Sequence, residues 1–531
     1  MKKKHRRNTL KNMLLTVLSV LSLGLASITG AQTLHRGIGG EPGTLDPNLV
    51  SGNWEDMVVG DLFLGLVTDA ADGRGIPGAA TDWTVSDDGT VYTFHLRKDG
   101  KWSDGQPVTA HDFVFSLRRV MDPQTASTYA YILYPIKNAE AINTGKIRDL
   151  SQLGVRAIDD YTLEITLESS TPYFLELLTH YTAFPIPKHV VERYGKDWVK
   201  PGHLVSNGAY KLVEWLPQTH IKAVKNEWFY DADHVAIDTV FYYPTEDRSA
   251  ALKRFRAGEL DLNYEFPIDQ YDWLRENMPE ETVVSPQLGV YYYPLNLRNP
   301  KFQDVRVRKA LSMAINREVI TDKILKTGEV PAYSFVPPGI GDYRIQELDF
   351  KGMPYNKRLE DARKLMEAAG YSEDRPLELV LRYNTHDAHK KVAVAVAAMW
   401  KAIHVKTQLL NSEVAVHYAE LKEANFEVAR AGWVGDYADP QNFLSLLEPT
   451  PNNYGGYNNA QFNALMKQAA ETQDSTQRTR LMEQAERIAM DDYATIPIYY
   501  YVATNLVSQK VKGWVPNVLD KHRTRWMSIE R

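Results

Sequence analysis

Cysteine is absent from this chain of 531 residues. Its absence excludes disulfides, thiolate metal ligands and a cysteine nucleophile. It also excludes a lipid-anchored cysteine behind an export signal, so an exported form of the protein would diffuse freely in its compartment. Without disulfides, stability must come from the hydrophobic core, and the length is sufficient for two or three domains that each have one.

Long apolar runs are scarce as well, and the one near the N-terminus is too short to span a bilayer comfortably. This run, Met13–Ala26, follows a basic segment and precedes small residues that offer a cleavage site near Ala31. The pattern predicts a signal peptide over residues 1–31, and paired arginines within it leave the choice between the general and twin-arginine export routes open. We expect a soluble mature protein in the periplasm.

Positive charge is in deficit once the signal is removed. The signal carries six basic residues and no acidic one, so its removal lowers the formal net charge from −6 to −12. A moderately acidic exported protein is a poor candidate for binding nucleic acid or anionic lipid. We therefore expect no nucleic-acid partner, and nothing in the sequence indicates a cofactor.

Familiar catalytic motifs are missing too. The sequence contains no G-x-S-x-G elbow, no H-E-x-x-H helix and no S-x-x-K with its downstream partners. With 67 acidic residues, a catalytic pair of carboxylates is not excluded by inspection, so an exported hydrolase stays open as an alternative. No pattern places such a pair, and the sequence predicts a protein that is not an enzyme.

Strand-like and helix-like segments alternate along the chain, which predicts an α/β fold. Alternating polar and apolar residues predict strands at Tyr92–Arg97 and Tyr161–Leu167. Helical spacing predicts helices at Asp304–Leu325, Leu359–Ala369 and Lys390–Ile403, the second ending at a glycine.

Aromatic residues are abundant, with 30 tyrosines and 11 tryptophans. Many of them belong to three predicted strands, at Leu288–Leu297, Phe426–Trp433 and Ile496–Val502. Tyrosine-rich strands are often half-buried sheet. They also suit the wall of a binding cleft, because each ring combines apolar area with one hydrogen-bonding tip.

A long motif gives the chain its resemblance to a known family. Residues 80–119 are ATDWTVSDDGTVYTFHLRKDGKWSDGQPVTAHDFVFSLRR. This block is very similar to the signature of the peptide and nickel class of binding proteins of ABC importers. The likeness continues through Ser206–Leu212, Asp304–Leu311 and Ala429–Trp433, and it is strongest to the oligopeptide-binding branch.

The resemblance implies a two-lobed periplasmic binding protein fold with an extra third domain, hinged around a central cleft. Lobe I would comprise residues 32–67, 191–288 and 504–531, and lobe II residues 289–503. The extra domain would comprise residues 68–190. The implied function is to capture short peptides and deliver them to the membrane permease of an ABC importer, and we expect the receptor to be a monomer.

The resemblance also implies which residues bind the two peptide termini. Asp436 matches the position that holds the ammonium group, whereas an isolated aspartate in such a glycine-rich loop would suggest only a turn. Arg430 and His389 match positions that bind the carboxylate, although His389 alone would suggest a helix cap. Asp439 is expected to serve a turn or a helix start.

The backbone of a peptide of arbitrary sequence is met most simply by strand addition. Ala431, Gly432 and Trp433 are the residues expected to lie against it. Tyr129, Tyr292 and Tyr501 match cleft positions of the family.

Three positions depart from the family pattern. Ser51 replaces an acidic residue, Val414 a pocket-lining tryptophan and Leu421 an arginine. Because the terminus-binding residues are kept, we expect peptide binding to persist while the preferred side chains differ.

Two alternative ligands stay open within the same fold. A receptor for murein peptides is indistinguishable at this level. A receptor for a metal complex or haem is the other, since His386 and His389 lie three residues apart on a predicted helix. No third ligand flanks that pair, and the sequence predicts no metal site.

Overall fold

The computed structural model describes residues 31–530, and for Val414 and Ala415 it describes the backbone alone. The predicted signal peptide therefore lies outside the described residues, apart from Ala31. In the described part of the chain, no helix has both the length and the apolar character needed to cross a membrane.

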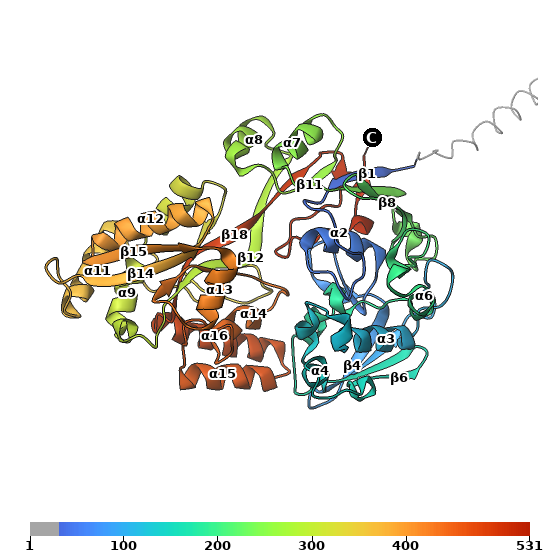
Figure 1. The fold of residues 1–531 in the computed structure, drawn as a ribbon, viewed down its shortest axis with the longest axis horizontal. Helices are drawn as coiled ribbons and strands as arrows, with labels where there is room; N and C mark the ends of the chain where they lie inside the picture. The colour runs from blue at the N-terminus through green and yellow to red at the C-terminus, as the bar shows by residue number, and fades with distance from the viewer. Residues whose placement is uncertain (1–30, 531) are drawn as a thin grey trace, which may run out of the picture.

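A nine-stranded mixed sheet connects the two lobes, in the order β17-β12-β18-β11-β1-β10-β9-β8, with β13 also paired to β18. Its strands are β1 (Thr33–Gly37), β8 (Tyr210–Leu216), β9 (His220–Lys225), β10 (Thr239–Tyr243), β11 (Leu262–Tyr264), β12 (Thr282–Pro294), β13 (Val330–Pro331), β17 (Ala431–Val434) and β18 (Thr495–Val507). Strands β12 and β18 are 13 residues long and run side by side from one half of the molecule to the other (Figure 1).

Lobe I contains both ends of the described chain. The part of the large sheet that belongs to this lobe is covered by α2 (Asn53–Leu62), α7 (Arg248–Arg256) and α8 (Tyr271–Asn277). Helix α6 (Lys188–Tyr194) lies where the chain returns from the extra domain to this lobe. Two short strands near the C-terminus, β19 (Val511–Lys512) and β20 (Ser528–Ile529), pair with each other.

The C-terminal segment is fixed to lobe I and to strand β2 (Val67–Asp69) of the extra domain by buried polar bonds. The Thr524 backbone N–H donates to Asp61 over 2.8 Å, and Arg36 donates to the Thr524 hydroxyl over 2.7 Å. Arg523 donates to Asp69 over 2.7 Å and forms an ion pair with Asp56 at 3.2 Å. These bonds join residues more than 450 positions apart in the sequence.

The extra domain is built on a four-stranded antiparallel sheet in the order β4-β5-β7-β6. The strands are β4 (Ala80–Val85), β5 (Val91–Leu96), β6 (Val155–Asp159) and β7 (Thr162–Thr166). Helix α3 (Ala110–Met121) turns its apolar face to this sheet, and α4 (Ala139–Asn143), α5 (Phe174–Leu177) and the hairpin of β2 (Val67–Asp69) and β3 (Gly75–Pro77) complete the domain.

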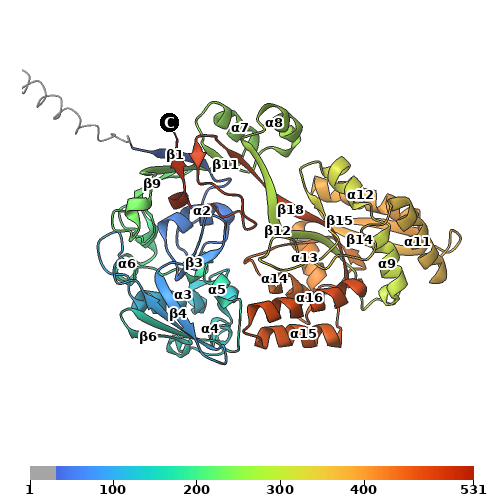
Figure 2. The same cartoon turned by 180° about the vertical axis from the view of Figure 1, so that it is seen from behind.

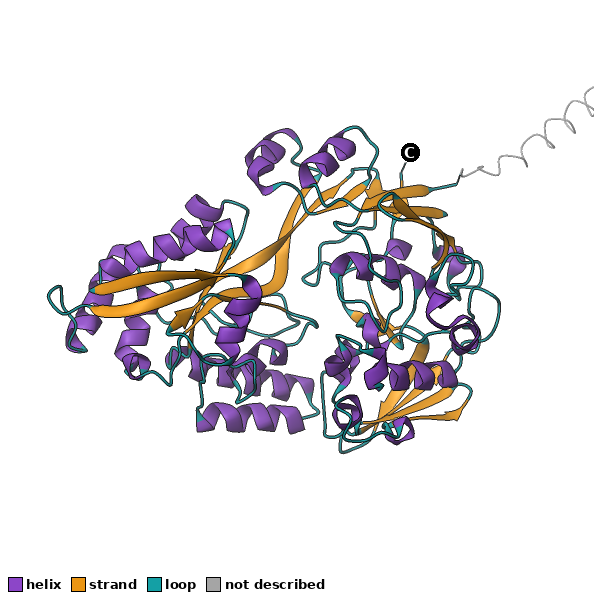
Figure 3. Ribbon diagram, in the orientation of Figure 1, coloured by secondary structure: helices purple, strands orange, loops and turns teal. Residues whose placement is uncertain are grey.

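Lobe II adds a parallel sheet, β15-β14-β16, with helices around it (Figure 3). Its strands are β14 (Leu377–Asn384), β15 (Val405–Ser412) and β16 (Val428–Ala429). The helices of the lobe are α9 (Val305–Met313), α10 (Arg317–Val319), α11 (Tyr355–Ala368), α12 (Asp387–Lys401), α13 (Val414–Lys422), α14 (Gln441–Leu444), α15 (Ala460–Glu471) and α16 (Ser475–Asp491).

The extra domain contacts lobe II at the side away from the connecting strands. The rings of Tyr173 and Tyr437 stack at 5.3 Å with an angle of 2° between their planes. Gln473, between α15 and α16, donates to the Ser170 hydroxyl. Figures 1 and 2 show α15 and α16 beside this domain from both sides.

Most elements predicted from local pattern are confirmed, and two are wrong. The strand expected over 426–433 is divided into β16 and β17, which belong to different sheets. The strands at 92–97 and 161–167 are β5 and β7, and the helices at 359–369 and 390–403 are α11 and α12. The single helix expected over 304–325 is broken, because the Asn316 side chain accepts from the Val319 N–H and starts a new helix there. The exact domain boundaries stay a prediction.

Candidate functional site

Strand β17 is an edge strand of the large sheet. It pairs with β12 on one side, and just beyond its end the Gly435 N–H donates to the Leu288 carbonyl over 2.7 Å. In an antiparallel strand, the backbone N–H and C=O groups of successive residues point to opposite sides. The backbone groups of Trp433 and Ala431 therefore also point toward β12, whereas those of Gly432 and Val434 point away from it. The outer side of β17 therefore presents the backbone groups of Gly432 and Val434.

Glycine at position 432 leaves room for two neighbouring side chains. A Cβ atom there would lie 2.8 Å from the Arg430 guanidinium and would overlap the Tyr501 hydroxyl. Both groups reach across the strand at this point. A side chain at 432 would therefore displace the polar groups beside the open edge.

Arg430 lies between β16 and β17, where the chain passes from the parallel sheet to the large one. It is buried, and its guanidinium donates to Tyr501 over 2.8 Å, Tyr418 over 3.0 Å and Asn384 over 3.2 Å. The Tyr291 ring lies 5.0 Å from the guanidinium carbon.

The charge of Arg430 has no acidic partner within the described residues. Its contacts are hydroxyls, an amide and a ring, and its Nε atom is buried without a hydrogen bond. Burial raises the pKa of Tyr501 and Tyr291, so both hydroxyls stay neutral. A buried cation in such neutral surroundings is a strong receptor for an anion, because local screening is weak.

His389 lies in the first turn of α12, with its ring 5.5 Å from Tyr291 and 4.7 Å from His386. Burial and the charge of Arg430 lower its pKa to about 3, and its Nδ1 atom is buried without a partner. The predicted cationic group is therefore a neutral imidazole in this structure. The helix cap is His386, which accepts from the Ala388 N–H over 3.2 Å.

Asp436 follows β17 and is half-buried. Burial raises its pKa to about 6, against the lowering effect of the Lys521 charge. Within the described residues, it forms no ion pair. After burial, its carboxylate is the next cause of the raised pKa values of Tyr129 and Tyr131, so it faces these rings of the extra domain.

Tyr129 belongs to an aromatic group opposite Asp436. Its ring lies 5.5 Å from Tyr131, 5.0 Å from His180 and 5.9 Å from Tyr181. These rings belong to the extra domain, whereas β17 belongs to lobe II. Asp436 and the aromatic group thus form two sides of one junction between lobe II and the extra domain.

The remaining residues predicted for the site, Tyr292, Ala431 and Trp433, belong to strands β12 and β17. Tyr292 is buried with its ring edge-on to Phe335 at 5.0 Å, and Ala431 is buried in the core of lobe II. Trp433 is half-buried and donates to Asn442 over 2.5 Å. These positions shape the strand that carries the open edge.

The three departures from the family pattern differ in their surroundings. Leu421 is fully buried in the core of lobe II, which explains why it is apolar. Ser51 is exposed, and its N–H donates to Glu55 over 3.0 Å. The Val414 side chain lies outside the described residues. Asp439 accepts from the Gln441 N–H over 2.9 Å at a helix start, as expected, and also pairs with Arg478.

Local pattern missed several residues of the site. Val434 was not expected because an outward backbone direction depends on the pairing with β12. Asn384 and Tyr418 come from other elements and meet Arg430 only in the folded protein. Tyr437 directly follows Asp436 in the sequence, and this position next to a predicted binding residue is the signal that could have identified it.

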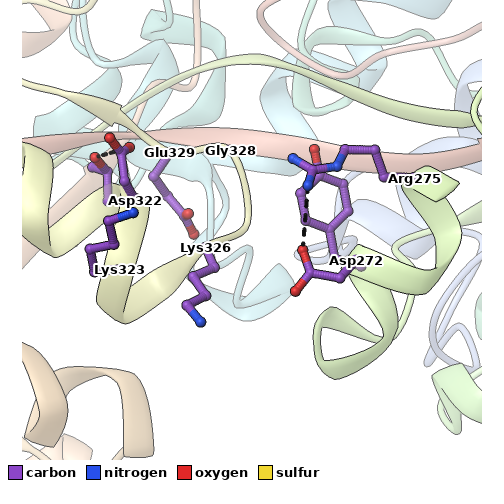
Figure 4. Close-up of a pocket in the computed structure, with 9 residues that line it drawn as sticks. Asp272, Arg275, Asp322, Lys323, Lys326, Gly328 and Glu329 are labelled. Carbon is purple, nitrogen blue, oxygen red and sulfur yellow. Dashed lines mark hydrogen bonds and ion pairs between the residues drawn. The ribbon is translucent and has the colours of Figure 1, made fainter.

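A separate pocket of about 430 Å³ lies outside this region (Figure 4). It opens between α8 and residues 321–329, with Asp272 and Arg275 on one side and Lys323 and Lys326 on the other. None of the predicted site residues lines it. Among the described residues, no group of three or more His, Asp or Glu side chains is arranged to hold a metal ion.

Comparison with known proteins gives a consistent result. Residues 75–455 match the family of bacterial extracellular solute-binding proteins, family 5 Middle. The chain is 40% identical over 504 residues to the periplasmic oligopeptide-binding protein OppA of Escherichia coli K12, covering 94% of this chain and 92% of the relative.

Two solved structures differ in how well they superpose. The unliganded open form of the murein tripeptide-binding protein MppA has a TM-score of 0.88 at 39% identity, covering 94% of this chain and 98% of that one. Haemophilus influenzae OppA in complex with the peptide RPPGFSPFR has a TM-score of 0.73 at 37% identity, covering 94% and 99%. The identities are similar, so the higher TM-score means that this structure superposes better on the unliganded open form than on the peptide complex.

Proposed function

The chain belongs to the family 5 bacterial extracellular solute-binding proteins, and we propose that it is a periplasmic receptor that captures short oligopeptides and delivers them to an ABC permease for import. The observation that carries this proposal is the edge strand β17 with a cation before it and a carboxylate after it. These three features match the three constant parts of any peptide: carboxylate, backbone and ammonium.

In this proposal, the peptide lies along the outer side of β17 with its direction reversed relative to the strand. The ammonium group binds Asp436 and the backbone bonds to Gly432 and Val434. The carboxylate of a short peptide binds Arg430, with Tyr501 and the neutral His389 as further hydrogen-bonding groups. Peptide side chains point away from these contacts, which explains how one site accepts many sequences.

In this proposal, closure follows from a peptide that contacts lobe II and the extra domain at the same time. In the open arrangement, β17 and Asp436 belong to lobe II while Tyr129 and its neighbours belong to the extra domain. A peptide that touches both sides stabilises the closed form more than the open one, so binding shifts the population of the two forms. No covalent step is involved, and the receptor acts as a monomer.

Murein peptides are the second candidate ligand. The similarity to the murein tripeptide-binding protein favours this candidate, because its sequence identity to this chain is close to that of the oligopeptide-binding relative. Both ligand types have a free ammonium group and a carboxylate. The geometry of the termini would therefore serve either of them.

The proposed compartment is the periplasm, as for the oligopeptide-binding relative. The basic and apolar segment over residues 1–31 supports export with cleavage near Ala31. A protein without cysteine would not be tethered through a lipid-modified residue of that type. Diffusion between the cell-wall space and the permease then follows.

Mass spectrometry of the molecules released on denaturation tests this proposal. The protein is purified without ligand exchange, and its native mass is compared with its denatured mass. A ladder of short peptides of mixed sequence is the expected result. A single wall-derived peptide would favour murein recognition, and a metal complex, a haem or a non-peptide ligand would overturn the peptide assignment.

A further inference from the structure

Leu288 brings two distant segments together beside Asp436. Its carbonyl accepts from the Gly435 N–H over 2.7 Å, and its own N–H donates to the Val518 carbonyl over 2.7 Å. Gly435 directly precedes Asp436, and Val518 lies three residues before Lys521. The C-terminal segment of lobe I therefore passes next to the carboxylate that is proposed to bind the peptide ammonium.

Lys521 is held so that its side chain points into this junction. Its N–H donates to the Asn517 side chain over 3.2 Å, and its carbonyl accepts from the same side chain over 2.7 Å. The preceding residue, Asp520, has a φ of 53° and turns the chain sharply. The Nζ atom of Lys521 is buried and has no hydrogen-bond partner.

Carboxyl groups from three parts of the molecule surround this ammonium group. Its charge acts on Asp56 of α2, on Glu176 of α5 and on Asp436, and also on the imidazole of His180. Asp56 already pairs with Arg523. Glu176 has no side-chain hydrogen bond to any described residue, and burial raises its pKa to about 7.

A buried ammonium group without an acceptor is costly, because it has lost its hydration. Among the surrounding groups, Asp436 is the carboxylate that is both unpaired and ionised near neutral pH, since Asp56 has a partner and the pKa of Glu176 lies higher. Asp436 also faces the neutral rings of Tyr129, Tyr131 and Tyr181, which supply no charge. Lys521 is thus the cation whose charge acts on Asp436.

We propose that Lys521 is the built-in counter-ion of Asp436, which neutralises the carboxylate in the empty receptor and competes with the ammonium group of an incoming peptide. This inference rests on the proposed peptide-binding function. It makes Lys521 a residue that sets the affinity for free N-termini. It also keeps Asp436 ionised to lower pH than burial alone would allow, because a nearby positive charge favours the carboxylate.

The test compares Lys521→Met with Lys510→Met, a control in the same C-terminal segment whose side chain is exposed. Titration calorimetry measures the affinity for a tripeptide with a free N-terminus and for its N-acetyl form. Loss of the competing charge should tighten binding of the free peptide by about tenfold at pH 7 and leave the acetylated one unchanged. Lys510→Met should bind both as the wild type does.

A second pair of variants keeps the result interpretable. Lys521→Gln replaces Lys521→Met if the latter does not fold. In an Asp436→Asn background, the Lys521 substitution should no longer tighten binding, because its partner has no charge.

Weaker or unchanged binding of the free peptide by folded Lys521→Met or Lys521→Gln would overturn the counter-ion role. A selective loss of peptides with acidic side chains would show instead that Lys521 binds a ligand carboxylate. If the wild-type protein binds neither the free nor the acetylated peptide, the proposed function itself fails. A wild-type preference for the free peptide that Lys521 substitutions leave unaltered rejects this inference alone.

Discussion

Arg523 and Arg430 are both buried, yet their surroundings are opposite. Arg523 joins the C-terminal segment to two carboxylates, Asp56 of lobe I and Asp69 of the extra domain. Arg430 lies beside the open edge of β17 and is surrounded by tyrosines and an amide. The charge of Arg523 is neutralised within the fold, whereas the charge of Arg430 has no acidic partner among the described residues.

The same contrast separates two acidic residues of one loop. Asp439 forms two hydrogen bonds with Arg478, at 2.6 and 2.7 Å, and both side chains are buried. Asp436, three residues earlier, has no ion pair within the described residues and a pKa raised to about 6. Arg523 and Asp439 form close ion pairs within the fold, whereas Arg430 and Asp436, which we propose bind peptide, form none within the described residues, and Lys521 acts on Asp436 without such a pair.

The largest effect that would test this comparison is expected from Arg523→Met. Removing the guanidinium leaves Asp56 and Asp69 buried without a counter-ion, which should cost about 3–5 kcal/mol of unfolding free energy. Arg430→Met leaves no carboxylate behind and should cost about 1 kcal/mol. Urea denaturation measures both. Equal losses would remove the distinction between the two arginines.

A substitution at each aspartate sharpens the comparison. Asp439→Asn should lower the unfolding free energy by about 3 kcal/mol, because Arg478 loses its partner, and should leave peptide affinity almost unchanged. Asp436→Asn should lower the unfolding free energy by less than Asp439→Asn, because it breaks no close ion pair, and should weaken peptides with a free N-terminus by about a hundredfold. An N-acetylated peptide is the control, and its equal weakening would argue against an ammonium-binding role.

Peptide affinity should depend on pH through Asp436, at the end of the site that is proposed to bind the ammonium group. The pKa of Asp436 is raised by burial to about 6, so the empty receptor takes up a proton there as the pH falls below that value. A bound ammonium group requires the ionised form, and affinity should therefore fall by about tenfold per pH unit below pH 6. Calorimetry at several pH values measures this. A flat profile in wild type, or the same slope in Asp436→Asn, would contradict the assignment.

The smallest effect is expected from Gly432→Ala. The added methyl group would lie 2.8 Å from the Arg430 guanidinium and displace it, with an expected cost of about 1 kcal/mol, or roughly a fivefold loss of peptide affinity. Gly352→Ala is the matched control, because a Cβ there meets no atom within 4 Å. Unchanged affinity in Gly432→Ala would show that the outer edge of β17 tolerates side chains.

Local sequence pattern was sufficient for elements whose neighbours lie nearby in the chain. Strands β5 and β7 and helix α12 follow from side-chain periodicity, which depends on one buried face. Asn316 shows the limit, because its side chain competes with the backbone and ends a helix that periodicity would continue.

The candidate site depended on the family resemblance and on long-range contacts. Asp436 and Arg430 were identified through the motif around them, and their roles stay predictions. Lys521 had no local signal, since a single lysine near the C-terminus is common and its position beside Asp436 arises only through Leu288. The pairing of Asp439 with Arg478 similarly joins a loop to a helix 39 residues away.

The last residues of the chain also affect the order in which the protein folds. Asp61 and Asp69 are made near the beginning of synthesis, but their partners Thr524 and Arg523 are made at its end. Until then, Asp69 is without the counter-ion that Arg523 supplies, and Asp61 has its ion pair with Arg36 but lacks the bonds from Thr524. We therefore expect a chain that ends before Arg523 to have a less stable first lobe than the complete chain.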